Sequence, residues 1–170
     1  MGQIIRTSEE ILPEDRVTNS LIQKSEEAKV EVPYNNYGER GYVDLVINKN
    51  ELTTVWELKS NPRSANDVIR QFQKMCENFE EGTSIDLRTN KTYYLAFTAS
   101  DKNIEHLRNN KPMYLTLLQS NLVRIVMADE TGCFTDVYEN REIRKESLKN
   151  LKGVNIDDNL ICPYCGKEYE

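Results

Sequence analysis

The stretch GYVDLVINKNELTTVWELKS, residues 41–60, decides the fold of this chain. It contains two short apolar runs, YVDLVIN and TTVWELK, joined by a polar turn around residues 48–52, which is the pattern of a β-hairpin. Each run carries charge where charge is costly, namely Asp44 in the first and Glu57 with Lys59 in the second. Either these side chains lie on the solvated face of an ordinary hairpin, or they form a site.

Strand alternation determines which of these side chains can meet. Glu57 and Lys59 are two residues apart and share one face of their strand. Asp44 can lie close to Glu57 if the two strands pair. Two carboxylates at close range repel, and each raises the pKa of the other. A divalent cation removes that cost, because hard oxygen ligands suit Mg²⁺, and such a cation also polarises a phosphate and lowers the pKa of a bound water.

Length and composition limit the class of protein. A chain of 170 residues fits one domain with a small appendage, and 38% hydrophobic with 29% charged residues is an ordinary soluble composition. No apolar run approaches the ~20 residues of a membrane span, and the N-terminus lacks a signal-peptide pattern, so we expect a cytoplasmic protein without membrane contact. The net charge of −6 disfavours coating of nucleic acid by bulk charge, but it allows a DNA-acting enzyme with a local basic groove and a metal ion.

The rest of the chain alternates between helical and strand patterns. Besides the two hairpin strands, the sequence predicts a helix at 13–28, a break at 31–41, a helix at 67–79, a buried strand at 91–100, a short helix at 103–108, a helix or turn up to 120, strands at 122–128 and 133–138, and a helix at 140–151. Consecutive strands form an antiparallel pair, whereas strands separated by helices favour parallel neighbours. We therefore expect an α/β protein with a mixed central β-sheet and helices on both faces.

These residues resemble a known family, the PD-(D/E)xK nuclease superfamily, which has the restriction-endonuclease-like fold. The motif is Asp44, followed thirteen residues later by Glu57-Leu58-Lys59. The proline that often precedes the first aspartate is absent, at a position that varies in such proteins. The resemblance covers about residues 12–128 and rests on the ordered combination of short motifs.

The resemblance implies a three-layer core and a metal-dependent phosphodiesterase. Asp44, Glu57 and the backbone carbonyl of Leu58 would hold Mg²⁺ or Mn²⁺. Lys59 would orient or deprotonate the attacking water and stabilise the charge that develops on phosphorus.

Other candidate residues lie on helices. Glu14 matches an acidic residue of the first helix that could help bind a second metal or its water shell, although an acid in a first helical turn is also favourable without a function. Gln71, in RQFQKM, matches a glutamine that would position the phosphate or the lysine. Arg63, Arg70 and Lys74 could contact phosphate, but a solvated helix face explains them equally well.

The expected function is a DNA endonuclease of restriction, repair, recombination or a mobile element, with a homodimer as one way to cut two strands. The alternative is a catalytically silent nucleic-acid-binding or assembly module on the same fold. Histidine-based hydrolysis has little support, because His106 is the only histidine and no Ser or Cys motif accompanies it.

The tail, residues 154–170, differs in character from the nuclease-like domain at 1–153. Its CPYCG motif places Cys162 and Cys165 at the spacing of one zinc knuckle. Zinc normally has four ligands, and Cys133 is a candidate third. Three interpretations stay open: a symmetric dimer that shares one Zn²⁺, a longer chain with a second knuckle, or a metal-free pair.

Overall fold

The structure is a computed structural model that describes residues 13–23 and 27–138. Within these residues, six strands form one mixed sheet in chain order; the β3–β4 and β4–β5 pairs are parallel and the other neighbours are antiparallel. The elements are α1 (Pro13–Gln23), β1 (Glu27–Asn36), β2 (Glu39–Lys49), β3 (Leu52–Lys59), α2 (Ala65–Gly82), β4 (Asn90–Thr98), α3 (Asp101–Asn109), α4 (Lys111–Leu115), the 3₁₀ helix η1 (Thr116–Gln119), β5 (Val123–Ala128) and β6 (Phe134–Asp136).

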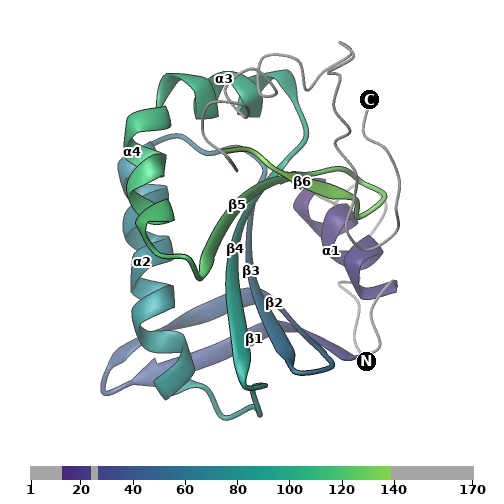
Figure 1. Ribbon diagram of the computed structural model, residues 1–170, viewed down its shortest axis with the longest axis vertical. Helices are drawn as coiled ribbons and strands as arrows, with labels where there is room; N and C mark the ends of the chain where they lie inside the picture. Colours follow the sequence, from purple (N-terminus) through teal and green to yellow (C-terminus); the bar gives the residue numbers. More distant parts are fainter. Residues whose placement is uncertain (1–12, 24–26, 139–170) are drawn as a thin grey trace.

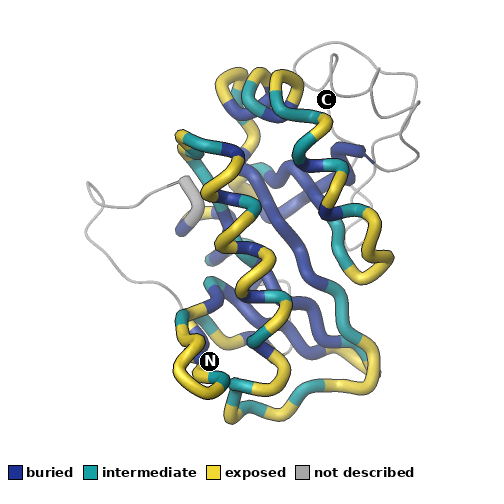
Figure 2. The backbone as a smooth tube through the Cα atoms, turned by 90° about the vertical axis from the view of Figure 1, so that its left-hand side faces the viewer, coloured by how far each residue is buried: buried dark blue, intermediate teal, exposed yellow. Residues whose placement is uncertain are grey.

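Helices cover both faces of the sheet, as the sequence predicts. Helices α2 and α4 lie on one face and α1 on the other (Figure 1). Helix α2 links β3 to β4, and the segment with α3 and α4 links β4 to β5. Both connections join neighbouring parallel strands in the same direction across the sheet. Because such connections have the same hand, their helices lie on the same side of the sheet. Figure 2 looks onto that side and shows buried strands behind α2, whose outer turns are exposed.

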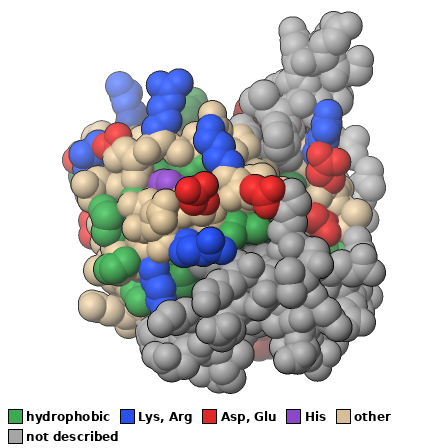
Figure 3. All heavy atoms as spheres, turned by 90° about the horizontal axis from the view of Figure 1, so that it is seen from above, with side chains coloured by type: hydrophobic (Ala, Val, Ile, Leu, Met, Phe, Trp, Pro, Cys, Tyr) green, Lys and Arg blue, Asp and Glu red, His purple; other side chains and the backbone are tan. Residues whose placement is uncertain are grey.

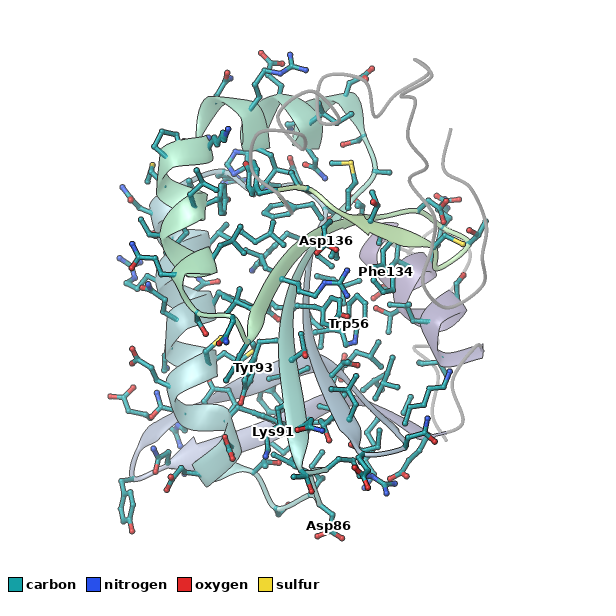
Figure 4. The ribbon with its side chains drawn as sticks, in the orientation of Figure 1. Trp56, Asp86, Lys91, Tyr93, Phe134 and Asp136 are labelled. Carbon is teal, nitrogen blue, oxygen red and sulfur yellow. The ribbon has the colours of Figure 1, made fainter. Side chains whose placement is uncertain are left out.

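Strand alternation divides the core into two clusters. On the α2 side, Val55 packs with Phe72 and other apolar residues of the helix. On the α1 side, Trp56 stacks on Tyr94 with ring centroids 4.0 Å apart, and Phe134 meets the indole edge-on at 5.1 Å (Figure 4). Consecutive residues of β3 therefore serve opposite layers, which confirms the face assignment made from the sequence.

The largest difference from prediction lies between residues 24 and 41. The helix expected over 13–28 ends at Gln23, and the expected break at 31–41 forms the second half of β1, a turn and the start of β2. Pro33 fits there because β1 is an edge strand, where a missing N–H can face away from the sheet. Tyr37 and Gly38 form the turn with positive φ values of 52° and 95°, as a type I′ hairpin requires.

Halfway along this hairpin, the alternation of side chains between the two faces of the sheet is interrupted. Ala28 packs in the α1-side cluster, whereas Val32 and Tyr34 pack in the α2-side cluster, although even spacing would keep them on one face. The change occurs at Glu31, whose φ of 50° lies in the left-handed region. In the otherwise continuous register of β1 and β2, the position opposite Glu31 belongs to Asp44. The hairpin thus bends where the first residue of the motif lies.

An ion pair ties the edge strand β6 to β5. Arg124 donates two hydrogen bonds to Asp136 and a third to Tyr94, in a half-buried position. Replacing Asp136 with Ala leaves the guanidinium partly buried without its counter-charge, so we expect the free energy of unfolding to fall by about 2 kcal/mol, or Tm by about 4–8 °C. Thermal melting checks this value, with Asp67→Ala as the control because its pair with Arg70 is exposed.

Candidate active site

The candidate site lies where β2 and β3 separate. Their paired residues end at Leu45 and Trp56, while β2 continues along β1 as far as Glu39. At the next position the two strands are joined by a side chain instead of by backbone hydrogen bonds. Oδ2 of Asp44 accepts a hydrogen bond from the backbone N–H of Leu58 at 2.7 Å. This contact holds the Asp44 carboxylate at the gap between the strands.

Glu57 shares this gap with Asp44. Only 15% of its side chain is exposed. Burial raises the pKa of Glu57 to about 9, and the hydrogen bond and negative charge of Asp44 act in the same direction, while Lys59 opposes them. In the metal-free protein, Glu57 therefore holds a proton at neutral pH. A cation bound between the two carboxylates would replace that proton.

Lys59 completes the cluster from the same strand. Its Nζ lies 3.9 Å from Oε2 of Glu57 and donates a hydrogen bond of 3.3 Å to Oε1 of Gln71 on α2. Gln71 reaches the lysine because α2 packs on this face of the sheet through Val68, Phe72 and other buried residues. The structure thus brings together four of the residues singled out in the sequence, from β2, β3 and α2.

The structure does not place the remaining candidate side chains in this cluster. The side chain of Glu14 and the residues Cys162 and Cys165 lie outside the described part of the chain. Cys133, the candidate third zinc ligand, is buried between β5 and β6. The Leu58 side chain packs in the α1-side cluster, so only its backbone belongs to the site.

Two of the three basic candidates are already engaged in other contacts. Arg70 forms an exposed ion pair with Asp67 at 2.7 Å. Lys74 donates to the backbone carbonyl of Arg40 at 3.0 Å, which joins α2 to the outer part of β2. Arg63 is exposed in the loop before α2.

The structure adds Asn103, which the sequence analysis did not single out. Its Nδ2 donates to the backbone carbonyls of Ser60 at 3.3 Å and Thr98 at 2.7 Å, so it fixes the end of β3 directly after Lys59. Ser100 caps α3 by accepting from the Asn103 N–H. The Ser-x-x-Asn pattern marks a helix start in sequence, but the clamp on β3 depends on tertiary packing.

Tyr34 is a second residue that the sequence analysis did not assign to the site. It is buried on the α2 side, and its hydroxyl lies 2.8 Å from where a Cβ on Gly41 would stand, so only glycine leaves room for it there. Burial raises the pKa of Tyr34, and the charge of Glu57 adds to the effect. The hairpin thus contributes a buried tyrosine whose pKa responds to the charge of Glu57.

The only histidine belongs to a structural contact. His106 pairs with the hydroxyl of Tyr114 at 2.7 Å, and burial lowers its pKa. Seen from the α3 end, acidic and basic side chains are interspersed around it (Figure 3). In the described residues, no group of three or more His, Cys, Asp or Glu side chains lies close enough together to hold a metal ion.

A three-layer α/β fold with an Asp, a Glu and a Lys at the separation of two strands defines the restriction-endonuclease-like class. A family model described as PD-(D/E)XK nuclease superfamily domain matches residues 17–160, and the chain belongs to this superfamily. The predicted family and fold are thereby confirmed. Comparison with curated proteins and with solved structures gave no match.

Membership supports a nuclease in general and nucleic acid as its substrate, and nucleases of this superfamily typically use divalent metals such as Mg²⁺. Among the residues that the structure describes, no helix is both long enough and apolar enough to cross a membrane.

Proposed function

We propose that this protein is a divalent-metal-dependent nuclease that hydrolyses phosphodiester bonds of DNA, with Asp44, Glu57 and Lys59 as its active-site residues. One observation carries the proposal. In a chain of a nuclease superfamily, two carboxylates share a mostly buried gap, burial and the proximity of Asp44 raise the pKa of Glu57, and a lysine ammonium lies 3.9 Å away.

The residues of the gap fit a hard divalent cation. Asp44 and Glu57 offer carboxylate oxygens, and the carbonyl of Leu58 would complete the protein's share of an oxygen-rich ligand set. One oxygen of Asp44 accepts a hydrogen bond from the Leu58 N–H, which orients the carboxylate at the gap. When bound, Mg²⁺ or Mn²⁺ would polarise the scissile phosphate and lower the pKa of a bound water.

The chain's own residues supply the rest of the chemistry. The Lys59 ammonium orients the attacking water and stabilises the negative charge that develops on the phosphate oxygens. The water oxygen forms a new bond to phosphorus, one P–O ester bond breaks, and the leaving oxygen takes up a proton. Gln71 holds the ammonium in place through its hydrogen bond of 3.3 Å.

Several finer assignments accompany this proposal. Glu14 would support a second metal or its water shell, and Arg63 is the basic candidate best placed to take a phosphate, because Arg70 and Lys74 are already engaged. We also propose a homodimer, a role in restriction, repair, recombination or a mobile element, and a Zn²⁺ bound at Cys162 and Cys165. The active-site geometry described above does not depend on these three assignments.

The test is a cleavage assay of the full chain with Mg²⁺ or Mn²⁺ on single-stranded, duplex and branched DNA. We expect the wild type to cut at least one substrate and Asp44→Ala to lose at least about 10³-fold in rate, because one carboxylate cannot hold the cation alone. Asp86→Ala is the matched control, since this exposed aspartate lies at the opposite end of the sheet (Figure 4). If the wild type cuts none of the substrates with either metal, the nuclease proposal fails; DNA binding without cleavage would then favour the silent module.

A further inference from the structure

An exposed tyrosine lies beside the candidate site. Tyr42 precedes Asp44 by two residues in β2, about 7 Å along the strand, and 70% of it is exposed. The burial pattern of this part of β2 alternates: Arg40 and Tyr42 are exposed and Asp44 is half-buried, while Val43 is buried. Arg40 and Tyr42 therefore share the solvent-facing side of the outer part of the strand, which we call the Tyr42 face, and Asp44 follows at the gap where the strands change faces.

We propose that Tyr42 stacks on an unpaired base next to the scissile phosphate, and that the substrate is single-stranded DNA or DNA with unpaired bases at the cleavage site. This inference rests on the proposed nuclease function and adds the substrate class to it.

The hairpin geometry supports this role. After the change of face at Glu31, the side chains of Val32 and Val43 pack in the α2-side cluster. The neighbouring residues of the outer hairpin therefore point to the opposite face, which is open to solvent. The cross-strand partner of Tyr42 is Pro33, which is also exposed, so the ring and the proline make one apolar surface. In the described residues only Tyr37, Tyr42 and Leu122 are large exposed hydrophobic side chains, and Tyr42 is the one that lies two residues from Asp44.

The charges around the site favour stacking over phosphate clamping. Arg40 is the basic residue on the Tyr42 face, whereas Glu31 stands across from Asp44 and Glu39 lies 3.9 Å from the Lys74 ammonium. With one basic residue on this face, counterion release contributes little affinity there. Stacking of a base on an aromatic ring contributes about 1–3 kcal/mol and tolerates any sequence. A paired base inside a duplex has no free face for such a ring, so the geometry selects unpaired bases.

The experiment compares the full chain with its Tyr42→Ala, Tyr42→Phe and Tyr42→Trp variants. The probes are a single-stranded oligonucleotide with one 2-aminopurine, whose fluorescence falls on stacking, and a blunt duplex of the same sequence, both with Mg²⁺. Binding is read in the Lys59→Ala background, which prevents cleavage. Tyr37→Ala is the matched control, because this tyrosine is fully exposed on the same hairpin but lies in the turn, five residues away.

We expect Tyr42→Ala to lower kcat/KM on the single strand about tenfold to a hundredfold and to abolish the quenching of 2-aminopurine. Phe and Trp at this position, and the Tyr37→Ala control, should retain both signals within about threefold. The wild type should prefer the single strand to the blunt duplex by at least about tenfold.

Three results would overturn the inference while leaving the nuclease intact: normal single-strand cleavage by Tyr42→Ala, equal loss in the Phe and Trp variants, or preference for the blunt duplex. A wild type that cuts no DNA with either metal refutes the proposed function instead, so the two failures are distinguishable. Because the side chain is largely exposed, Tm should change by less than about 2 °C in every variant at this position.

Discussion

Replacing Lys59 with Ala is expected to lower the rate of DNA cleavage by at least about 10³-fold while metal and DNA binding persist. The lysine ammonium lies 3.9 Å from Glu57 and 3.3 Å from Gln71, so its removal takes the positive charge from the place where the phosphate gains negative charge. Groups of this kind act mainly in the transition state, so kcat should fall far more than KM rises. Single-turnover cleavage and equilibrium binding to the same oligonucleotide measure the two effects.

The controls for Lys59 separate chemistry from folding. Lys29→Ala removes an exposed lysine of β1 and should leave cleavage unchanged within about twofold. Gln71→Ala should cost less than Lys59→Ala, about tenfold, because the lysine keeps its charge and loses only a positioning contact. Lys59→Ala with a normal cleavage rate would show that the ammonium has no part in the reaction.

The affinity for Mg²⁺ or Mn²⁺ is expected to rise about tenfold per pH unit between pH 6 and 8. Burial and Asp44 raise the pKa of Glu57 to about 9, so metal binding must displace the Glu57 proton throughout this window. Calorimetry in buffers of different ionisation enthalpy should therefore detect about one proton released per metal bound.

The same carboxyl links pH to stability. The pKa of Glu57 in the folded protein lies above its ordinary value of 4.5, so the metal-free fold binds a proton that the unfolded chain releases, and stability falls as pH rises from about 4.5 towards 9. Glu57→Gln should remove both the metal-binding slope and this pH dependence, and should raise the metal-free Tm at pH 8 by about 2–4 °C or more. Glu51→Gln, in the exposed β2–β3 turn, is the control. A metal affinity that does not change with pH would contradict the shared-proton arrangement.

Sequence patterns predicted the parts of the site that depend on local periodicity. Alternation placed Glu57 and Lys59 on one face of β3, and the helical spacing of Val68, Phe72 and Phe79 predicted a helix that packs one face on the core. The structure places this helix, α2, on the same side of the sheet as Lys59, where Gln71 can reach the lysine. Two consecutive strands with a polar turn gave the antiparallel pair of β2 and β3. These features need only the 2.0 and 3.6 residue periods and a short connection.

The rest depended on contacts between distant segments. Pro33, two asparagines and two glycines suggested a break, yet the edge of a sheet accepts the proline and the I′ turn uses the glycine. No local pattern indicates that Glu31 adopts φ of 50° or that the strands change faces opposite Asp44. The clamp of Asn103 on Ser60 joins residues 43 positions apart, and only the folded sheet brings them together.

The four side chains gathered at the separation of β2 and β3 all come from one stretch, residues 44–71. One hairpin and the first turns of the helix that follows it are enough to set their relative positions. Such short sequence separations carry a small entropy cost of loop closure, and they speed folding relative to contacts between distant segments. The arrangement of Asp44, Glu57, Lys59 and Gln71 can therefore form early in folding, before the edge strand β6 joins the sheet.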